Sequence, residues 1–349
     1  MNSLTWIVVL AASWTLAANA CGEEQDAAAK KTYAAHGKIV RLDAALDAII
    51  PKEAKMERLA DGFEWSEGPV WSKKGGYLLF SDIPRNQIVK WQPTSGISVF
   101  REKAGYTGEA EFTGGEPGTN GLTFDSEGNL VTCAHGDRVI QRFAGGKADG
   151  KRTILAAKYE GKRLNSPNDL VYKSNGDLYF TDPPYGLPKQ YDDPGRELDW
   201  CGVYRVAKSD GKLTLLTKEM TRPNGIAFSP DEKTLYVANS DPKLAIWKAF
   251  PVKDDGTLGK GKVIHDVTEL VGEKNPGLPD GMKVDAKGNL FATGPGGVWI
   301  LTAEGKPLGR LDTGEATANC GFGDDGSTLY ITADMYLLRI KLATKGLGF

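Results

Sequence analysis

Six segments of the chain alternate apolar and polar positions at a period of two on either side of a Gly-containing turn. A period of two is typical of half-buried β-strands, and a short turn with Gly between two such runs predicts a β-hairpin. Three of these turns are SEGN, SNGD and AKGN. The six predicted hairpins begin at Glu67, Asn120, Asn168, Asn224, Asp280 and Asn319.

The same pattern recurs at intervals of about 40 to 56 residues, which indicates a repeat architecture. Each hairpin is followed by a further strand-like run, namely QIVKW, RVIQRF, GVYRV, LAIWKAF, GVWIL and YLLRI. Some units add a fourth run such as KLTLLT. The predicted fold is therefore all-β, a six-bladed β-propeller with four-stranded blades. The sixth unit is one strand short, so we expect HGKIVRLDAAL or KMERLADG, from the N-terminal region, to complete it and close the ring.

The N-terminus predicts export. Residues 1–20 contain the apolar run LTWIVVLAASWTLAANA and end in small residues, which is typical of a secretory signal peptide rather than a membrane span. Cys21 follows directly, so two products stay open: a lipoprotein anchored at Cys21 and a soluble periplasmic protein. Residues 21–54 are predicted as a tether and lead-in, and residues 55–349 as the propeller.

The charge composition of the chain limits the classes of binding partner. The 43 Lys and Arg against 45 Asp and Glu give a net charge of −2, which excludes a field that would gather nucleic acid or an anionic membrane. We expect a monomer without a transmembrane span in the mature chain. Cys133, Cys201 and Cys320 form no CxxC pair, so one disulfide is allowed and none is required.

The first residue of each predicted hairpin, here called its head, is a candidate functional residue. The first strand of a propeller blade lines the central channel, so the six heads are predicted to converge at one mouth of it. An Asn before a strand is commonly a turn residue. Six axial copies, of which only Glu67 and Asp280 are acidic, favour a binding site instead.

Two carboxylates and several amide oxygens suit one hard divalent cation. Ca²⁺ takes about 6 to 8 oxygen ligands, and Mg²⁺ or Mn²⁺ would compete for the same groups. Zn²⁺ is the poorer match, because the chain has three His residues and neither an HExxH motif nor paired Cys.

From about residue 55 onward the chain resembles the gluconolactonase and regucalcin (senescence marker protein) family of six-bladed propellers. The resemblance rests on SEGPVW, LLFSDIPRNQIVKW, SPNDLVYKSNGDLYFTDPPYGL, RPNGIAFSPDEKTLYVAN and PDGMKVDAKGNLF. The bacterial gluconolactonase branch is most similar, through YGLPKQYDDPGRELDWCGVYRV. The resemblance implies that Glu67, Asn224 and Asp280 are metal ligands and that Asn168 binds the metal or the substrate. It also implies a metal-dependent lactonase that acts on a small sugar lactone of the D-glucono-1,5-lactone type.

Further residues are assigned roles around this site. Asp280 is expected to position or deprotonate the attacking water, and His135 either moves a proton or is a buried structural His. Asn120, Asn319 and Arg222 are expected to bind substrate, although Arg222 could equally pair with an acid at a blade edge.

Three more features have competing interpretations. Asp182 is interpreted as a cap of the following turn rather than a pocket residue. The excursion over residues 185–200 is either a lid or a surface loop. Trp71, Trp91 and Trp299 are assigned to packing between blades.

Two other functions stay open. One is a phosphotriesterase-like hydrolase, by similarity to diisopropyl fluorophosphatase, and the other is an exported calcium-dependent binding module without catalysis. Dinucleotide binding is excluded, because GFGDDG lies in a predicted hairpin with no following helix. A serine hydrolase is not indicated, since the chain has no GxSxG motif.

Overall fold

Six antiparallel sheets follow one another along the chain and form the predicted six-bladed propeller. The structure is a computed structural model that describes Met1 and residues 32–349. Residues Tyr33–Phe349 form the compact unit described below. Apart from Met1, the predicted signal peptide lies outside the described residues, as does Cys21.

Each of the first three blades is a meander of four strands in sequence order. Blade 1 contains β4 (Ser66–Ser72), β5 (Tyr77–Asp82), β6 (Gln87–Gln92) and β7 (Gly96–Glu102). Blade 2 contains β8 (Thr119–Phe124), β9 (Leu130–Ala134), β10 (Val139–Phe143) and β11 (Arg152–Ala156). Blade 3 contains β14 (Leu170–Tyr172), β15 (Leu178–Asp182), β16 (Gly202–Val206) and β17 (Leu213–Thr217).

The last three blades repeat the meander, and two of them also take up strands from the N-terminal region. Blade 4 contains β18 (Pro223–Phe228), β19 (Thr234–Asp241), β20 (Leu244–Pro251) and β21 (Lys262–Asp266). Blade 5 contains β22 (Met282–Val284), β23 (Leu290–Gly294), β24 (Gly297–Leu301) and β25 (Pro307–Asp312). Blade 6 contains β26 (Thr317–Gly323), β27 (Thr328–Ala333) and β28 (Tyr336–Lys341).

The ring is closed by β3 (Glu57–Ala60), which pairs antiparallel with β28 and supplies the missing strand of blade 6. Of the two candidate segments, KMERLADG is thus the closing strand. The other, HGKIVRLDAAL, contributes β2 (Lys38–Arg41), which becomes a fifth strand of blade 5 beside β25. A short β1 (Ala34–Ala35) pairs with β3. The compact unit therefore begins at Tyr33, earlier than the predicted boundary at residue 55.

Minor elements occupy the connections. Strands β12 (Lys158–Tyr159) and β13 (Lys162–Arg163) form a small hairpin between blades 2 and 3. The described residues also contain the 3-10 helices η1 (Ala44–Ala48), η2 (Ala144–Gly146), η3 (Gln190–Asp192) and η4 (Thr268–Leu270).

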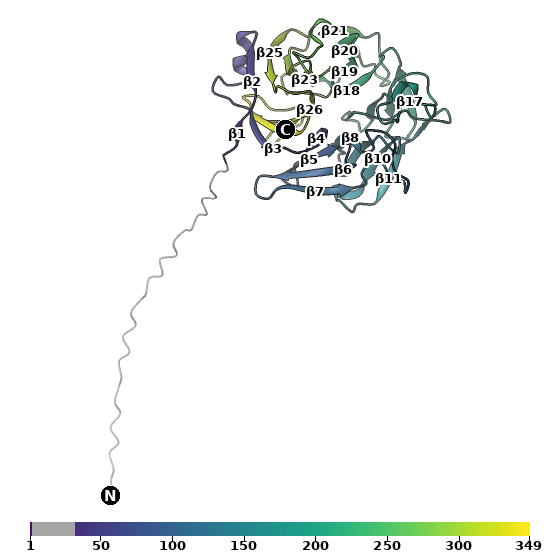
Figure 1. Ribbon diagram of the computed structural model, residues 1–349, viewed down its shortest axis with the longest axis horizontal. Coiled ribbons are helices and arrows are strands. Elements are labelled where there is room, and N and C mark those ends of the chain that lie inside the picture. The colour runs from purple at the N-terminus through teal and green to yellow at the C-terminus, as the bar shows by residue number, and fades with distance from the viewer. Residues whose placement is uncertain (2–31) are drawn as a thin grey trace. The chain divides into compact units, whose positions relative to one another are not determined.

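Figure 1 shows β4, β8, β18 and β26 near the middle of this unit and β7, β11, β17 and β21 at its outside. Because sheets twist, each blade lies against the next and buries large side chains between them. Trp71 of blade 1 stacks on Tyr330 of blade 6 at a ring distance of 5.5 Å. Trp299 of blade 5 is buried in one cluster with Trp247 of blade 4. Trp91 of blade 1 also lies 5.5 Å from Tyr330, so the predicted role of Trp71, Trp91 and Trp299 in inter-blade packing is confirmed.

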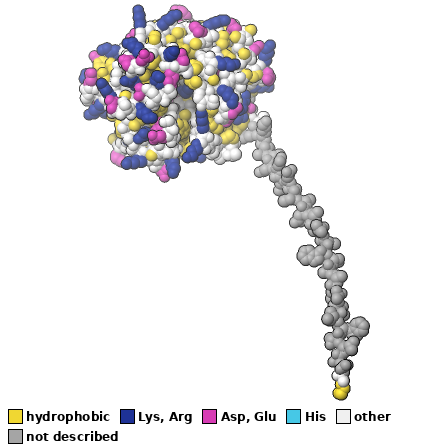
Figure 2. All heavy atoms as spheres, turned by 180° about the vertical axis from the view of Figure 1, so that it is seen from behind, with side chains coloured by type: hydrophobic (Ala, Val, Ile, Leu, Met, Phe, Trp, Pro, Cys, Tyr) yellow, Lys and Arg dark blue, Asp and Glu magenta, His cyan; other side chains and the backbone are white. Residues whose placement is uncertain are grey.

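The outer surface carries both signs of charge. On the face shown in Figure 2, Lys and Arg are interspersed with Asp and Glu, which agrees with the net charge of −2. Within residues 32–349, no helix has the length and hydropathy needed to cross a membrane.

Candidate metal centre

The axial side chains lie where the pairing between the two innermost strands of a blade is interrupted. In blades 1, 2 and 4 the register shifts immediately after the strand begins, between Glu67 and Val70, Thr119 and Leu122, and Pro223 and Ile226. Glu67, Asn120 and Asn224 are accordingly the second residues of their strands. The expectation that each head precedes its strand was wrong for these three, because the bulge lets the strand continue past the axial residue.

Glycine follows the axial residue in four blades because the backbone of the next blade lies against it. A Cβ on Gly68 would stand 2.2 Å from the carbonyl oxygen of Asn120, and one on Gly225 would stand 2.1 Å from that of Asp280. Gly68 also has a φ of +55°, which other residues seldom adopt. Because these backbones are in contact, the axial side chains of neighbouring blades lie close together.

Blade 6 departs from the predicted alignment by one residue. The Gly121 amide donates to the axial carbonyl of Asn168 at 2.8 Å, and the Gly281 amide donates in the same way to Ala318 at 2.8 Å. Ala318 is thus the axial residue of blade 6, and Asn319 stands one position further along. Its Nδ2 donates to Glu67 Oε2 at 3.0 Å. Asn319 therefore holds a carboxylate in place rather than completing a ring of six heads.

Asp169 of blade 3 occupies the position that Asn319 has in blade 6, and the sequence analysis missed it. The sequence does mark this position, because the residue after the axial one is Gly in blades 1, 2, 4 and 5 and Asp in blade 3. The Asp169 side chain is buried, and its Oδ1 accepts from the Leu170 amide at 2.8 Å. Its Oδ2 has no hydrogen-bond partner within the part of the chain that the structure describes.

Four axial oxygens are buried and make no hydrogen bond to any described residue: Oδ1 of Asn120, Asn168, Asn224 and Asp280. A buried acceptor left without a partner costs about 1–3 kcal/mol, so several in one place indicate a missing ligand. Glu67 completes the set, since both hydrogen bonds to its side chain use Oε2. Carboxylate and amide oxygens are the donors that hard cations prefer.

The electrostatics of the axis favour a bound cation. Burial raises the pKa of Glu67, and the nearby Asp169 carboxylate raises it further, while Lys283 opposes the shift. Burial likewise raises the pKa of Asp280, with further contributions from Glu67, Asp169 and Glu116. A divalent cation among these groups would stabilise their ionised forms. Residues 32–349 contain no cluster of three His, Cys, Asp or Glu that could hold a metal ion.

His135 lies beside a carboxylate that the sequence analysis did not single out. The His135 side chain is fully buried, and its Nδ1 is 3.0 Å from Oε2 of Glu116. The two groups are close but not aligned as a hydrogen bond, so neither ring nitrogen has a partner among residues 32–349. The register of blade 2 places Ala134 opposite Val139, as Asp182 lies opposite Gly202 in blade 3. His135 is thus one residue beyond the position of Asp182 to which it was compared.

The excursion over residues 185–200 brings aromatic side chains to the same mouth. The Arg222 guanidinium lies over the Tyr191 ring, 4.9 Å from its centroid, a cation–π distance. Among the described residues, no carboxylate forms an ion pair with Arg222. Burial raises the pKa of Tyr185, as does the nearby Asp280 carboxylate. Tyr185, at the start of the excursion, therefore lies near Asp280, and the lid interpretation stays a prediction.

Asp182 does not face the site. Its Oδ2 accepts from the Asn165 amide and its Oδ1 from the Ser166 amide, both at 2.8 Å. Burial raises the pKa of Asp182 to about 7, although both of these hydrogen bonds oppose the shift. Asp182 thus holds the segment that precedes β14, and the interpretation of Asp182 as a cap of the following turn was wrong.

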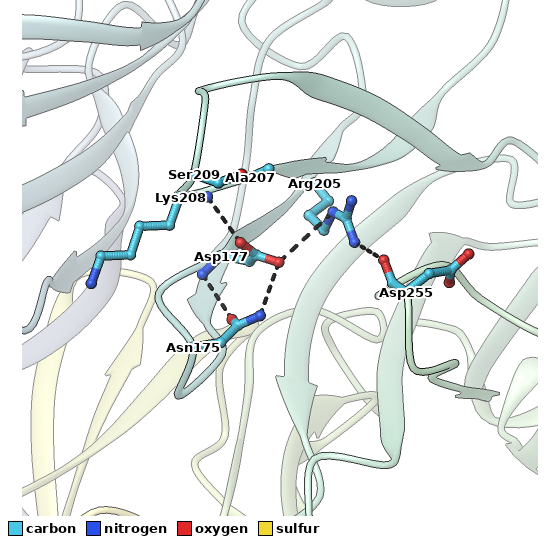
Figure 3. A pocket seen from close by; sticks show the side chains of 7 residues that line it. All are labelled: Asn175, Asp177, Arg205, Ala207, Lys208, Ser209 and Asp255. Atoms are coloured by element: carbon cyan, nitrogen blue, oxygen red, sulfur yellow. Dashed lines mark hydrogen bonds and ion pairs between the residues drawn. The ribbon is translucent and has the colours of Figure 1, made fainter.

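A surface pocket lies at the other end of the blade 3 and 4 strands and is separate from the axial oxygens (Figure 3). Asp177 lies in its centre and accepts from the Lys208 amide at 2.9 Å and from Asn175 Nδ2 at 3.1 Å. Arg205 donates to the carbonyl of Asp255. The polar groups that line this pocket are thus hydrogen-bonded to one another, which is typical of a structural cluster on the surface.

Comparison with known proteins finds relatives that are similar along nearly the whole chain. Residues 65–334 match the family described as SMP-30/Gluconolactonase/LRE-like region. A gluconolactonase of Zymomonas mobilis subsp. mobilis is 37% identical over 347 residues, covering 97% of this chain and 96% of that protein.

Solved structures agree with this result. A gluconolactonase of Xanthomonas campestris superposes with a TM-score of 0.76 at 32% identity, over 90% of this chain and 98% of that one. The calcium-binding protein regucalcin of Agrobacterium tumefaciens has the same fold, with a TM-score of 0.63 at 22% identity, over 84% of this chain and 94% of that one.

Proposed function

The chain belongs to the SMP-30/gluconolactonase/LRE family, and from this premise we propose that it is a lactonase that hydrolyses a small sugar lactone. The observation that carries the proposal is the group of four buried axial oxygens without partners, set beside the Glu67 carboxylate. A site of this kind takes a cation and, above it, an oxygen-rich ligand. A sugar lactone supplies both a carbonyl and several hydroxyl groups.

Glu67, Asn168, Asn224 and Asp280 are the residues that would hold the cation. Their all-oxygen donor set favours Ca²⁺, with Mg²⁺ or Mn²⁺ as competitors and Zn²⁺ as the poorest match. When bound, a divalent cation polarises the lactone carbonyl and stabilises the charge that develops on its oxygen.

The reaction needs a group that takes a proton from water as the new C–O bond forms and returns one to the ring oxygen as the ring opens. Asp280 would orient the water, a role supported by its half-buried side chain and its enclosed Oδ1. A carboxylate engaged by a cation is a weakened base. His135, with both ring nitrogens free of partners in the described residues, is the second group that can carry the proton.

Asn120, Asn168 and Arg222 are proposed to contact the substrate. Asn120 Oδ1 is an unused acceptor at the axis, and Arg222 is an unpaired guanidinium over Tyr191 at the mouth. Sugar hydroxyls would satisfy both, because they donate and accept hydrogen bonds.

The experiment that tests the function is proton release from D-glucono-1,5-lactone, followed with calcium and with chelator against the spontaneous hydrolysis rate. Acceleration that requires calcium and is lost in Glu67→Gln and Asp280→Asn is expected. A folded protein that binds the cation without accelerating hydrolysis would contradict the proposal, and phosphotriesters and binding assays would be the next tests.

We also propose that the protein is exported, on the apolar run and small residues that precede Cys21. Mass spectrometry of the mature protein tests this. Acylated Cys21 at the N-terminus would identify a lipoprotein, a start at Cys21 without lipid would identify a soluble product, and retention of Met1 with the apolar run would contradict export.

A further inference from the structure

We propose that Glu116 is a positioning residue for the lactonase reaction: it fixes the orientation and tautomer of His135, so that Nε2 is the atom that accepts the proton of the attacking water. This inference rests on the function proposed above and adds a residue to it. Glu116 lies on the connection between β7 and β8, and nothing in the repeat pattern singles it out.

The geometry around His135 supports a fixed imidazole. Its side chain is fully buried, and Nδ1 is 3.0 Å from Glu116 Oε2. Behind it, Gly186 packs so closely that a Cβ there would stand 2.5 Å from the His135 Cβ. The Gly186 amide is itself held by Ser166 Oγ at 2.8 Å. The ring is thus enclosed from the excursion side and has one carboxylate within reach.

The Glu116 carboxylate joins this ring to the axial site. The Glu116 side chain is 31% exposed, so its carboxylate can rotate into line with the Nδ1–H bond when a ligand closes the mouth. Catalytic hydrogen bonds are often poorly aligned before substrate binds. Glu116 is also close enough to contribute to the raised pKa of Asp280, after burial, Glu67 and Asp169. The geometry of blade 2 agrees, because Ala134 pairs with Thr119 and the His135 amide donates to the Gly118 carbonyl at 3.0 Å, which puts His135 at the end of the blade that carries Asn120.

The chemistry follows from the tautomer. A neutral imidazole carries one proton, and the nitrogen that donates a hydrogen bond leaves the other as an acceptor. Donation from Nδ1 to Glu116 leaves Nε2 unprotonated. As the water oxygen bonds to the carbonyl carbon, Nε2 takes one water proton. When the ring C–O bond breaks, Nε2–H returns that proton to the ring oxygen, so the imidazole ends neutral and the only co-reactant is water.

Nitrogen-15 NMR of the imidazoles tests the positioning without any turnover. The chain has three His residues, so His36 and His265 serve as internal references. At a pH of about 8, where an ordinary imidazole is neutral, we expect His135 to be the Nδ1–H tautomer in the wild type. Glu116→Ala should shift it toward Nε2–H, and Glu116→Gln should retain Nδ1–H, because the amide oxygen still accepts. An Nε2–H tautomer in the wild type, or no change in Glu116→Ala, would overturn the inference.

Kinetics then test whether the tautomer matters to the reaction. Removing the group that orients a metal-bound His costs about 10–100-fold in activity, and we expect a loss of the same order for the orientation of His135. Glu116→Ala should lose that factor in kcat with little change in KM, and Glu116→Gln should recover part of it. Glu111→Ala is the matched control, because Glu111 is an exposed carboxylate on the same connection that forms no hydrogen bond or ion pair among the described residues.

The double variant separates positioning from general damage. Residues that act as one unit lose activity non-additively. Glu116→Ala added to His135→Gln should therefore cost no further activity, whereas additive losses with a lowered Tm would assign Glu116 a structural role. A wild type without lactone turnover would sink the proposed function, and the NMR result would still decide whether Glu116 positions His135.

Discussion

Asp280 combines an unpartnered oxygen with a partly open position, and its substitution separates catalysis from stability. In Asp280→Asn we expect turnover to fall by about 10²-fold, because the attacking water would lose the carboxylate that orients it. The Tm of the cation-free protein should not fall, because the substitution removes the repulsion with Glu67 that helps to raise the pKa of Asp280. Thermal unfolding with chelator, beside the lactone assay, measures both; a melted variant would instead make Asp280 structural.

Asp182 should behave in the opposite way. Asp182→Ala leaves the amides of Asn165 and Ser166 without their acceptors, and each orphaned amide costs about 1–3 kcal/mol. We therefore expect a lower free energy of unfolding in urea and an unchanged kcat for the protein that remains folded. A kcat loss without destabilisation would show that Asp182 reaches the substrate.

The repeat pattern predicted Glu67, Asn120, Asn168, Asn224 and Asp280 as axial, because the same place in five blades carries an oxygen-bearing side chain. It misplaced Asn319 by one position, since a register shift next to a strand end leaves no mark in the apolar pattern. Asp169 and Glu116 were missed for different reasons. Asp169 replaces a glycine of the repeat, whereas Glu116 comes from an irregular connection whose course depends on tertiary contacts.

Among the elements, the contact between inner strands is sensitive to a single methyl group. A Cβ in Gly225→Ala would stand 2.1 Å from the carbonyl of Asp280, so β18 or the segment leading into β22 must move. We expect calcium affinity to fall by about tenfold or more, because displacing a buried cation ligand costs at least 1.4 kcal/mol. Isothermal titration with calcium measures this, and wild-type affinity in the variant would contradict the backbone contact.

The packing of blade 4 against blade 5 predicts a pH dependence. The His265 ring of β21 lies 5.8 Å from Trp247 in the same blade and 5.6 Å from Trp299 of blade 5. Burial lowers the pKa of His265 below 6.5, although Asp266 opposes the shift. As pH falls, the unfolded chain therefore takes up a proton at this His before the folded protein does. Stability from this group is present above about pH 6.5 and is lost as pH falls below it.

The test compares the free energy of unfolding at pH about 7.5 and about 5.5. The decrease should be smaller in His265→Gln than in the wild type, because the variant has no titrating ring there. An equal decrease in both proteins would assign the pH dependence to other groups.

The strands of the repeats were predictable because each has its own period-two pattern and turn. The pairing of the N-terminal segments was not predictable, because KMERLADG and HGKIVRLDAAL could each pair with any blade edge that lacks a strand. Only the three-dimensional ring assigns the first to β28 and the second to β25.

At the scale of the whole molecule, the cation is expected to bind across the blades. Carboxylates from blades 1, 3 and 5 lie close enough to raise one another's pKa, as Asp169 does for Glu67 and Glu67 does for Asp280. A ligand bound only by the folded state stabilises that state by mass action. Free calcium at about 100 times Kd would add about 2.7 kcal/mol. Differential scanning calorimetry should show a Tm that rises with calcium and falls with chelator, and a Tm independent of both would exclude a bound cation.

The hydrogen bond from Asn319 to Glu67 joins residues 252 positions apart and has a consequence for biosynthesis. A chain leaving the ribosome presents Glu67 early, but the partner that holds its carboxylate, and the strand β28 on which β3 closes, emerge last. Blades can form in order as they appear, yet the axial site is assembled only when synthesis is complete. A premature stop anywhere before blade 6 would thus leave the proposed cation site unfinished, and we expect calcium retention to distinguish full-length chains from truncated ones.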